Sequence, residues 1–211
     1  MTPGNEPDPE DLTARARIRE AAVKLFGELG FERTTFRGIA ELAGVAPSLV
    51  RHHFGSKQSL RDECDKQLIK TFRRLNERVE TAGLDAAPRV RPSAELGPYQ
   101  RYLARALSEG AATELFEEFI RIHEQWLARE DLTRDVPPQA DLRARAAVRT
   151  AMTLSVAVLH DHVSRTMDAD LTSPQGELRL LRALLDVHSR PLLTPQEAAA
   201  AGDALDRGEV P

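Results

Sequence analysis

The stretch from Thr34 to Lys57 reads TTFRGIAELAGVAPSLVRHHFGSK, and it predicts two short helices joined by a glycine turn. Gly44 can take the left-handed backbone conformation that a tight corner between helices needs. Pro47 suits the first position of the second helix, where its missing N–H is not required. On the first helix, apolar side chains recur at the spacing of a single face; they are Phe36, Ile39, Ala40 and Ala43.

The second short helix, expected from Pro47 to about Phe54, has one inward and one outward face. Val50 and Phe54 lie four residues apart and can pack inward together. The outward positions are then Pro47, Ser48, Arg51 and His52. Ser56 is a good N-cap for a following helix. Two helices around a glycine turn, with a polar face on the second, describe a helix-turn-helix DNA-binding unit.

The sequence from Ile18 to Leu60 resembles the N-terminal DNA-binding domain of TetR-family transcriptional regulators. The matching segments follow one another in the order and spacing of that family; they are Ile18–Ala22, Leu25-Phe26, Gly30-Phe31, Thr34-Thr35, Ile39-Ala40, Ala43–Val45, His53-Phe54, Ser56-Lys57 and Leu60. This resemblance implies an all-α protein, with a three-helix helix-turn-helix domain followed by a larger helical ligand-binding and dimerisation domain.

Ser48, Arg51 and His52 are the candidates for contact with base edges, and Pro47 is a candidate for apolar contact. Arg37 resembles the family position that reaches into the major groove, where an arginine can form two hydrogen bonds with guanine. His53 and Lys57 resemble the family's phosphate contacts. Thr34 and Thr35 precede a helix, so a hydroxyl can cap it and free N–H groups can hold a phosphate.

Two departures from the family pattern prevent the operator sequence from being copied from a relative. Ala46 stands where most relatives carry a small hydroxyl residue, and Leu49-Val50-Arg51 replaces a frequent Thr-Leu-Tyr run. The arginine can bind guanine or phosphate, which a tyrosine cannot do in the same way.

The charge is distributed unevenly along the 211 residues. The whole chain carries a net charge of −4, yet the residues from Thr13 to Lys57 hold eight basic and four acidic side chains. A basic N-terminal part on an acidic remainder is typical of a DNA-binding domain attached to a regulatory one.

The sequence argues against several other classes. It contains no GxSxG, P-loop or HExxH motif, so we expect neither an enzyme nor a bound cofactor. The adjacent His52 and His53 point about 100° apart on a helix, and His160 and His162 lie on opposite sides of one, so we expect no metal site. The single cysteine, Cys64, and the lack of an apolar run of membrane-spanning length suit a cytoplasmic protein.

Helical periodicity divides the chain into four parts. We expect a disordered acidic arm over residues 1–12, the DNA-binding domain over 13–58, a helical regulatory and dimerisation domain over 59–194, and a flexible tail over 195–211. Further helices are expected over residues 13–29, 57–81, 99–107, 112–129, 141–167 and 173–189. A linker rich in proline and glycine is expected over residues 83–98, and Val136-Pro137-Pro138 should break the chain.

The regulatory part offers candidates for a ligand cavity and for a dimer interface. The side chains that could line a cavity, although ordinary core is the simpler interpretation of each one alone, are Phe116, Phe119, His123, Trp126, Met152, Leu159 and His160. The resemblance implies that the last two long helices pair with their copies in a homodimer. The wide apolar surface of residues 173–189 and the small residues of the helix before it agree with such pairing.

Together these features predict a DNA-binding transcriptional regulator, a homodimeric repressor that an unknown small-molecule effector releases from a palindromic operator. The alternative is a constitutive DNA-binding or protein-binding helix-turn-helix module without an effector. Tight packing around Phe119 and Trp126 would favour that alternative.

Overall fold

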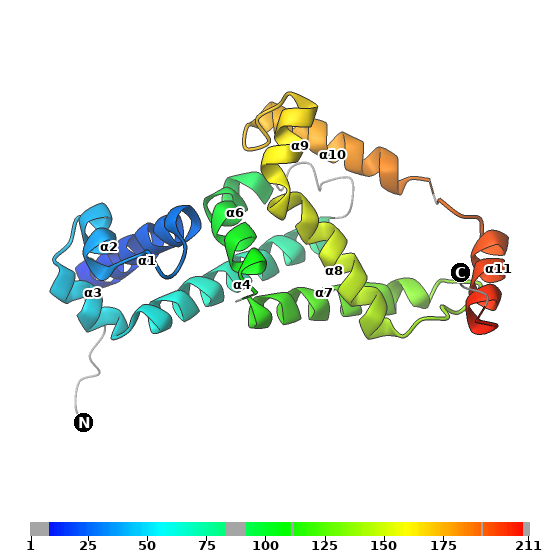
Figure 1. Cartoon of the computed structure of the whole chain (residues 1–211), viewed down its shortest axis with the longest axis horizontal. Coiled ribbons are helices and arrows are strands. Elements are labelled where there is room, and N and C mark those ends of the chain that lie inside the picture. Colours follow the sequence, from blue (N-terminus) through cyan, green and yellow to red (C-terminus); the bar gives the residue numbers. More distant parts are fainter. Residues whose placement is uncertain (1–8, 83–91, 111, 191, 209–211) are drawn as a thin grey trace.

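The computed structural model describes residues 9–82, 92–110, 112–190 and 192–208. This part of the chain contains ten α-helices and no β-strand, as the expected all-α fold requires. The helices are α1 (Pro9–Leu29), α2 (Phe36–Ala43), α3 (Pro47–Phe54), α4 (Lys57–Ala82), α6 (Pro92–Ser108), α7 (Thr113–Asp131), α8 (Leu142–Val158), α9 (His160–Met167), α10 (Pro174–His188) and α11 (Pro195–Asp206). Figure 1 shows α1–α3 at one end of an elongated molecule and α11 at the other.

The N-terminal helices share one hydrophobic core with the start of α4. Ile18 of α1, Ile39 of α2, Val50 of α3 and Leu60 of α4 are all fully buried in it. These residues occupy the apolar positions that helical spacing predicts, so burial of one stripe from each helix explains why the short helices α2 and α3 are stable.

The turn between α2 and α3 has the predicted geometry and is held from outside by α1. Gly44 lies in the left-handed region, with φ 64° and ψ 43°. The guanidinium of Arg17 donates hydrogen bonds to the carbonyl oxygens of Ala43 and, at 3.0 Å, of Gly44. Because these carbonyls end a helix and lack intrahelical partners, the arginine fixes the corner that orients α3.

Helix α4 connects the N-terminal bundle to the rest of the molecule, and its bounds agree closely with the prediction. The hydroxyl of Ser56 accepts a hydrogen bond from the backbone N–H of Ser59 at 3.0 Å, which confirms the predicted N-cap. Farther along, Arg73 of α4 pairs with the buried carboxylate of Glu118 in α7 at 2.5 Å. Arg121 binds the second oxygen of the same carboxylate, and Arg73 above all lowers the pKa of Glu118.

Helix α6 packs tightly against α1 and so joins the body to the N-terminal bundle. At Gly27, an added Cβ would lie 2.9 Å from the backbone nitrogen of Tyr102. Arg105 donates from Nε to the carbonyl oxygen of Gly27 at 3.0 Å and from Nη2 to that of Glu28 at 3.4 Å. On the other side of α6, the Tyr102 hydroxyl donates to Asp65 of α4 at 2.5 Å. Helix α6 is therefore bonded to both α1 and α4.

Gly27→Ala is expected to lower the free energy of unfolding by about 1–3 kcal/mol, because the new methyl group would press on the backbone of α6. Gly38→Ala in α2 is the matched control, since the nearest atom to its added Cβ is 3.5 Å away. The control should be neutral or stabilise by up to about 1 kcal/mol, the ordinary helix preference of alanine over glycine. Urea unfolding of both variants tests this, and equal effects would contradict the tight α1–α6 contact.

Two expected boundaries in the first half of the chain are wrong. Residues 9–12, assigned above to a disordered arm, belong to α1, while residues 1–8 lie outside the described chain. Residues 92–98, expected in a linker, belong to α6, with Pro98 in its second turn. Leu96 and Tyr99 pack against the core, and this tertiary contact outweighs the local signal of Gly97-Pro98. Residues 83–91 of the expected linker are outside the described residues.

Two expectations in the second half are also corrected. The single helix expected over residues 141–167 is divided at Leu159, where φ −94° and ψ 15° leave the helical region between α8 and α9. No glycine or proline marks this point. Residues 195–206, expected in a flexible tail, form α11. A complete capping box between Thr194 and Glu197 stabilises the start of this helix, and the alanines that follow favour helical structure. Residues 209–211 lie outside the described chain.

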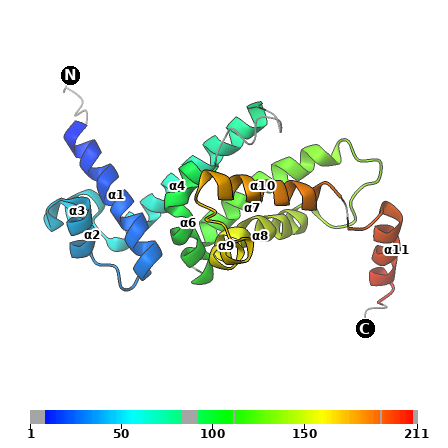
Figure 2. The same ribbon diagram turned by 90° about the horizontal axis from the view of Figure 1, so that it is seen from above.

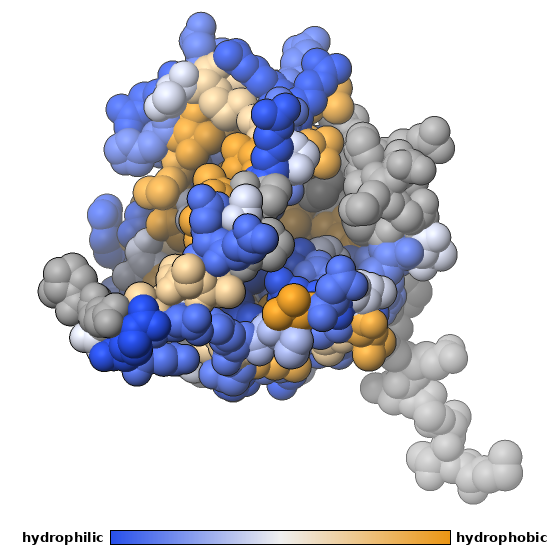
Figure 3. Space-filling model, turned by 90° about the vertical axis from the view of Figure 1, so that its right-hand side faces the viewer, coloured by the Kyte–Doolittle hydropathy of each residue, from blue (hydrophilic) through white to orange (hydrophobic). Residues whose placement is uncertain are grey.

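Helix α10 begins at the predicted cap, where the Ser173 hydroxyl accepts from the N–H of Gly176 at 3.1 Å. In Figures 1 and 2 it runs past α8 toward α11. Large apolar side chains on α8 and α10 face solvent; they are Val148, Met152, Leu178, Leu185 and Val187. Figure 3, viewed from the α11 end, shows apolar side chains gathered on this face. A single subunit therefore leaves uncovered the surface on which the sequence predicts a dimer.

Candidate nucleic-acid interface

Helix α3 presents the outward face that its sequence predicts. Its two buried residues are Val50 and Phe54, which anchor it in the N-terminal core. The side chains left exposed are Pro47, Ser48, Arg51 and His52. A short helix that is anchored on one side and carries polar and basic groups on the other can enter a DNA groove without rearranging the core.

The N-terminus of α3 has no side-chain cap. Ala46 makes no capping hydrogen bond, whereas the Thr35 hydroxyl caps α2 by accepting from the N–H of Gly38 at 3.1 Å. Pro47 has no N–H, and the N–H of Leu49 donates to the carbonyl oxygen of Ala46 at 3.0 Å, so the N–H of Ser48 is the one left for water or for a phosphate at this end of α3. Arg37, in the first turn of α2, is exposed like Arg51.

Thr34 has a structural task that limits its part in binding. The side chain is only 1% exposed, and its hydroxyl donates to the carbonyl oxygens of Gly30 at 2.7 Å and Leu25 at 3.1 Å. Because the hydroxyl is committed inside the protein, only its backbone could face a phosphate.

Lys57 also has internal partners that the sequence did not reveal. Its ammonium group donates to the carbonyl oxygens of Phe31 at 2.7 Å, Glu32 at 3.2 Å and Thr34 at 3.2 Å. It also lies 4.4 Å from the centre of the Phe31 ring. An ammonium group has three donors, and all three are used here. Lys57 therefore ties the start of α4 to the loop between α1 and α2.

Lys57→Met is expected to lower the free energy of unfolding by about 1.5–3 kcal/mol, the range for hydrogen bonds made by a charged group. Lys66→Met, in the same helix, is the control because Lys66 is exposed and its ion pair with Glu63 lies on the surface. That change should cost less than about 1 kcal/mol. Thermal unfolding monitored by circular dichroism measures both, and an unaffected Lys57→Met protein would contradict the assigned role.

The remaining basic groups near α3 are partly engaged within the protein. His53 is half-buried, with its ring 6.1 Å from that of Phe54. Arg15 of α1 pairs with Glu63 at 3.0 Å and lies 5.5 Å from the centre of the Phe54 ring. The cation–π contacts of Arg15 and Lys57 have no signature in sequence spacing, because they join residues far apart along the chain.

The seven side chains expected around a ligand cavity have different surroundings in the structure, and their part in ligand binding stays a prediction. Phe119 is 2% exposed and packs against Phe72 with 4.1 Å between ring centres. His123 is buried, its Nδ1 is 2.8 Å from the Thr150 hydroxyl, and burial lowers its pKa. Trp126 donates to Glu80 at 2.7 Å. Phe116 is half-buried, whereas Met152 and Leu159 face solvent.

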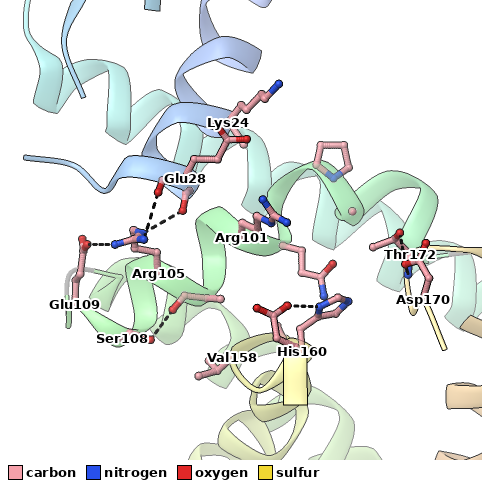
Figure 4. A pocket seen from close by; sticks show the side chains of 18 residues that line it. Lys24, Glu28, Arg101, Arg105, Ser108, Glu109, Val158, His160, Asp170 and Thr172 are labelled. Atoms are coloured by element: carbon pink, nitrogen blue, oxygen red, sulfur yellow. Dashed lines mark hydrogen bonds and ion pairs between the residues drawn. The ribbon is translucent and has the colours of Figure 1, made fainter. Parts of the chain in front are cut away.

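Only His160 of these seven lines the pocket of about 800 Å³ between α1, α6 and the junction of α8 with α9. Figure 4 shows this pocket, with Lys24 and Glu28 from α1 on one side and Val158 and His160 on the other. The sequence reasoning missed the site because its walls come from distant segments, one of which was taken for a linker.

Cys64 is the only cysteine, and it is buried in the core shared by α1 and α4. Burial raises the pKa of its thiol far above the usual value, so the thiol stays protonated and a poor nucleophile. Within the described ranges, no cluster of three or more histidine, cysteine or acidic side chains could hold a metal ion. A search of the same residues finds no helix with the length and apolarity needed to cross a bilayer.

Comparison with known proteins agrees with this fold. Residues 18–64 match the family described as bacterial regulatory proteins, tetR family. The chain belongs to this family. It is 39% identical over 141 residues to the HTH-type transcriptional regulatory protein RaaS of Mycobacterium tuberculosis, covering 64% of this chain and 66% of that protein. The chain spans about two thirds or less of the curated relatives it matches.

Two solved structures extend the likeness over most of the chain. A gamma-butyrolactone receptor, an ArpA-like protein, is 26% identical with a TM-score of 0.58, covering 85% of this chain and 99% of that one. CprB from Streptomyces coelicolor, in complex with its biological operator sequence, is 25% identical with a TM-score of 0.56. That match covers 72% of this chain and 81% of the CprB chain.

Proposed function

We propose that this protein is a sequence-specific DNA-binding transcriptional regulator that acts as a homodimeric repressor. The observation that carries the proposal is the exposed face of α3, formed by Pro47, Ser48, Arg51 and His52 on a helix anchored by Val50 and Phe54. The operator complex of the related CprB supports it. Residues 13–58 form the DNA-binding domain in this proposal, and residues 59–194 form the regulatory and dimerisation domain.

In the bound state α3 lies in the major groove and Arg37 approaches it from the first turn of α2. An arginine can donate two parallel hydrogen bonds to guanine O6 and N7, and Pro47 offers an apolar surface to a thymine methyl group. Thr35, at the start of α2, and His53, in the last turn of α3, contact the phosphate backbone. The charge of Lys57 strengthens the local positive field, although its donors hold the α1–α2 loop.

The homodimer forms through α8–α9 and α10, because pairing with a partner would bury their exposed apolar side chains. Small residues on α8 allow close approach of a partner helix; they are Ala144, Ala147, Ala151, Ser155 and Ala157. Two-fold symmetry then places two copies of α3 against a palindromic operator.

An effector that binds the DNA-incompetent dimer more tightly would release the operator by shifting the population of states. The gamma-butyrolactone receptor among the structural relatives supports a small-molecule effector. Helices α4 and α6 connect body and DNA-binding domain and are the coupling elements. We place the protein in the cytoplasm, where its DNA target lies.

The tight packing of Phe119 and the hydrogen bond of Trp126 favour a second candidate, a constitutive DNA-binding module without an effector at that position. Both candidates share the DNA-binding function. They differ in whether any small molecule changes operator affinity.

Selection of bound duplexes from a random pool tests the shared function. The full-length protein should recover a palindrome, and binding should fall steeply between low and physiological salt because several phosphates are contacted. If the recovered duplexes share no sequence and binding depends on salt alone, the protein is not a sequence-specific regulator.

A further inference from the structure

The corner between α2 and α3 is held by a side chain that comes from a different helix. The Nη2 atom of Arg17, in α1, donates to the carbonyl oxygens of Ala43 and, at 3.0 Å, of Gly44. This nitrogen carries two hydrogens, so it can serve both carbonyl groups at once. It also lies directly against the turn, since a Cβ added to Gly44 would be 2.8 Å from it. Figure 2 shows α2 and α3 beside α1. The contact therefore joins α1 to the turn from which α3 starts.

The N-terminal end of α3 depends on this turn for its position. Two residues separate Gly44 from Pro47, the first residue of α3. The side chain of Ala46 makes no capping hydrogen bond. The buried residues that anchor α3 in the core, Val50 and Phe54, lie farther along the helix. A change in the turn would thus move the start of α3 before it moved the anchored part.

The residues proposed to read DNA begin directly after this corner. Pro47 and Ser48 are the first two residues of α3, and Arg51 follows one turn later. A hydrogen bond weakens steeply as its angle departs from linear, so a small rotation of α3 is enough to lose a contact with a base edge. Because the Nη2 donors of Arg17 are used within the protein, its influence on these contacts passes through the orientation of α3.

We propose that Arg17 is a positioning residue for the reading of DNA sequence. It holds the α2–α3 corner against α1 and so fixes the angle at which α3 presents Ser48 and Arg51 to the base edges. This inference rests on the proposed DNA-binding function. The other role for an arginine near the start of α1 is direct contact with a phosphate. A phosphate contact strengthens binding to all sequences alike, whereas a positioning residue affects the discrimination between them.

Hydrogen exchange of the free protein tests the contact without DNA. The backbone N–H of Val45 donates across the corner to the carbonyl oxygen of Ala40 at 3.0 Å. In Arg17→Gln this amide should exchange about tenfold faster, as expected when the corner loses a hydrogen bond from a charged group. The N–H of Ile39, which donates to the carbonyl oxygen of Thr35 at the other end of α2, should keep its exchange rate.

DNA binding of the full chain tests the positioning role. For the palindrome selected by the original protein and a scrambled duplex, Arg17→Gln should lower the ratio of the two affinities at least about tenfold, as expected for loss of one base contact. Binding to the scrambled duplex should keep its salt dependence, because no phosphate contact is removed. Lys24→Gln is the control, since it removes an exposed positive charge from the same helix and should leave the ratio unchanged. Circular dichroism at the assay temperature verifies that both variants are folded.

Three results would overturn the proposal: unchanged exchange at Val45, an unchanged affinity ratio in Arg17→Gln, or an equal loss of that ratio in Lys24→Gln. A salt slope that falls by about 0.9 per subunit, with discrimination retained, would also overturn it and make Arg17 a phosphate contact. If the original protein selects no palindrome, the proposed function and the positioning role fail together. An unchanged ratio for a palindrome that is selected overturns the positioning role alone.

Discussion

Replacing Arg37 and Arg51 together by alanine is expected to abolish selective binding to the operator. Each arginine can contribute about 1–3 kcal/mol of discrimination through a two-hydrogen-bond contact with guanine, so the double variant should lose roughly 2–6 kcal/mol. Both side chains are exposed and outside the core, so the thermal midpoint should stay unchanged. Fluorescence anisotropy with the selected palindrome and with a scrambled duplex measures the loss.

The matched control keeps the positive charge of both side chains but removes the planar guanidinium group. Arg37→Lys with Arg51→Lys preserves attraction to phosphate but cannot form the planar pair of hydrogen bonds. It should retain binding to the scrambled duplex and lose most of the preference for the palindrome. If the lysine variant discriminates as well as the original protein, these arginines act through charge alone and the base-reading role assigned to them is wrong.

Leu185→Asp in α10 is expected to disrupt the dimer. The side chain is 62% exposed in the single subunit and lies on the apolar face proposed to meet the partner. A carboxylate there would be buried without a partner, at a cost of about 2–4 kcal/mol, which raises the dimer dissociation constant roughly 30- to 1,000-fold. Sedimentation equilibrium measures this change directly. Operator affinity should fall with it, because a single α3 reads only half of a palindrome.

Leu132→Asp provides the control for this change. Leu132 follows α7, is 85% exposed and lies outside α8–α10. The same chemical change there should leave the dimer intact. Dissociation by Leu132→Asp, or a stable dimer in Leu185→Asp, would move the interface away from α10.

The N-terminal part of the fold could be predicted in detail because its determinants are local. Helices α2 and α3 begin and end where Thr35, Gly44 and Pro47 place the boundaries. The exposed face of α3 follows from the four-residue spacing of Val50 and Phe54. These signals act within a few residues, so sequence alone contains them.

Other features depend on contacts between distant segments and could not be predicted in this way. Pro98 lies within α6 because its neighbours Leu96 and Tyr99 reach the core. Lys57 resembles a phosphate contact by position, yet its ammonium group holds the carbonyl oxygens of a loop more than twenty residues earlier. The pocket at the α1–α6 contact requires knowing that these helices meet at Gly27. Helical periodicity marks which face is buried but not which helix covers it.

The central claim, that α3 lies in the major groove of DNA, can be tested most directly by cleavage from a fixed position. Ser48→Cys would place an exposed thiol on α3, and the native Cys64 is buried, so an iron chelate can be attached to residue 48 selectively. On the selected palindrome, activation should cut at two patches related by two-fold symmetry, with centres about one helical turn or a multiple of it apart. The same chelate on Ser108→Cys, in α6, should give no such cuts. Uncut DNA with the residue 48 probe, under conditions where the protein binds, would show that α3 does not enter the groove and would contradict the account.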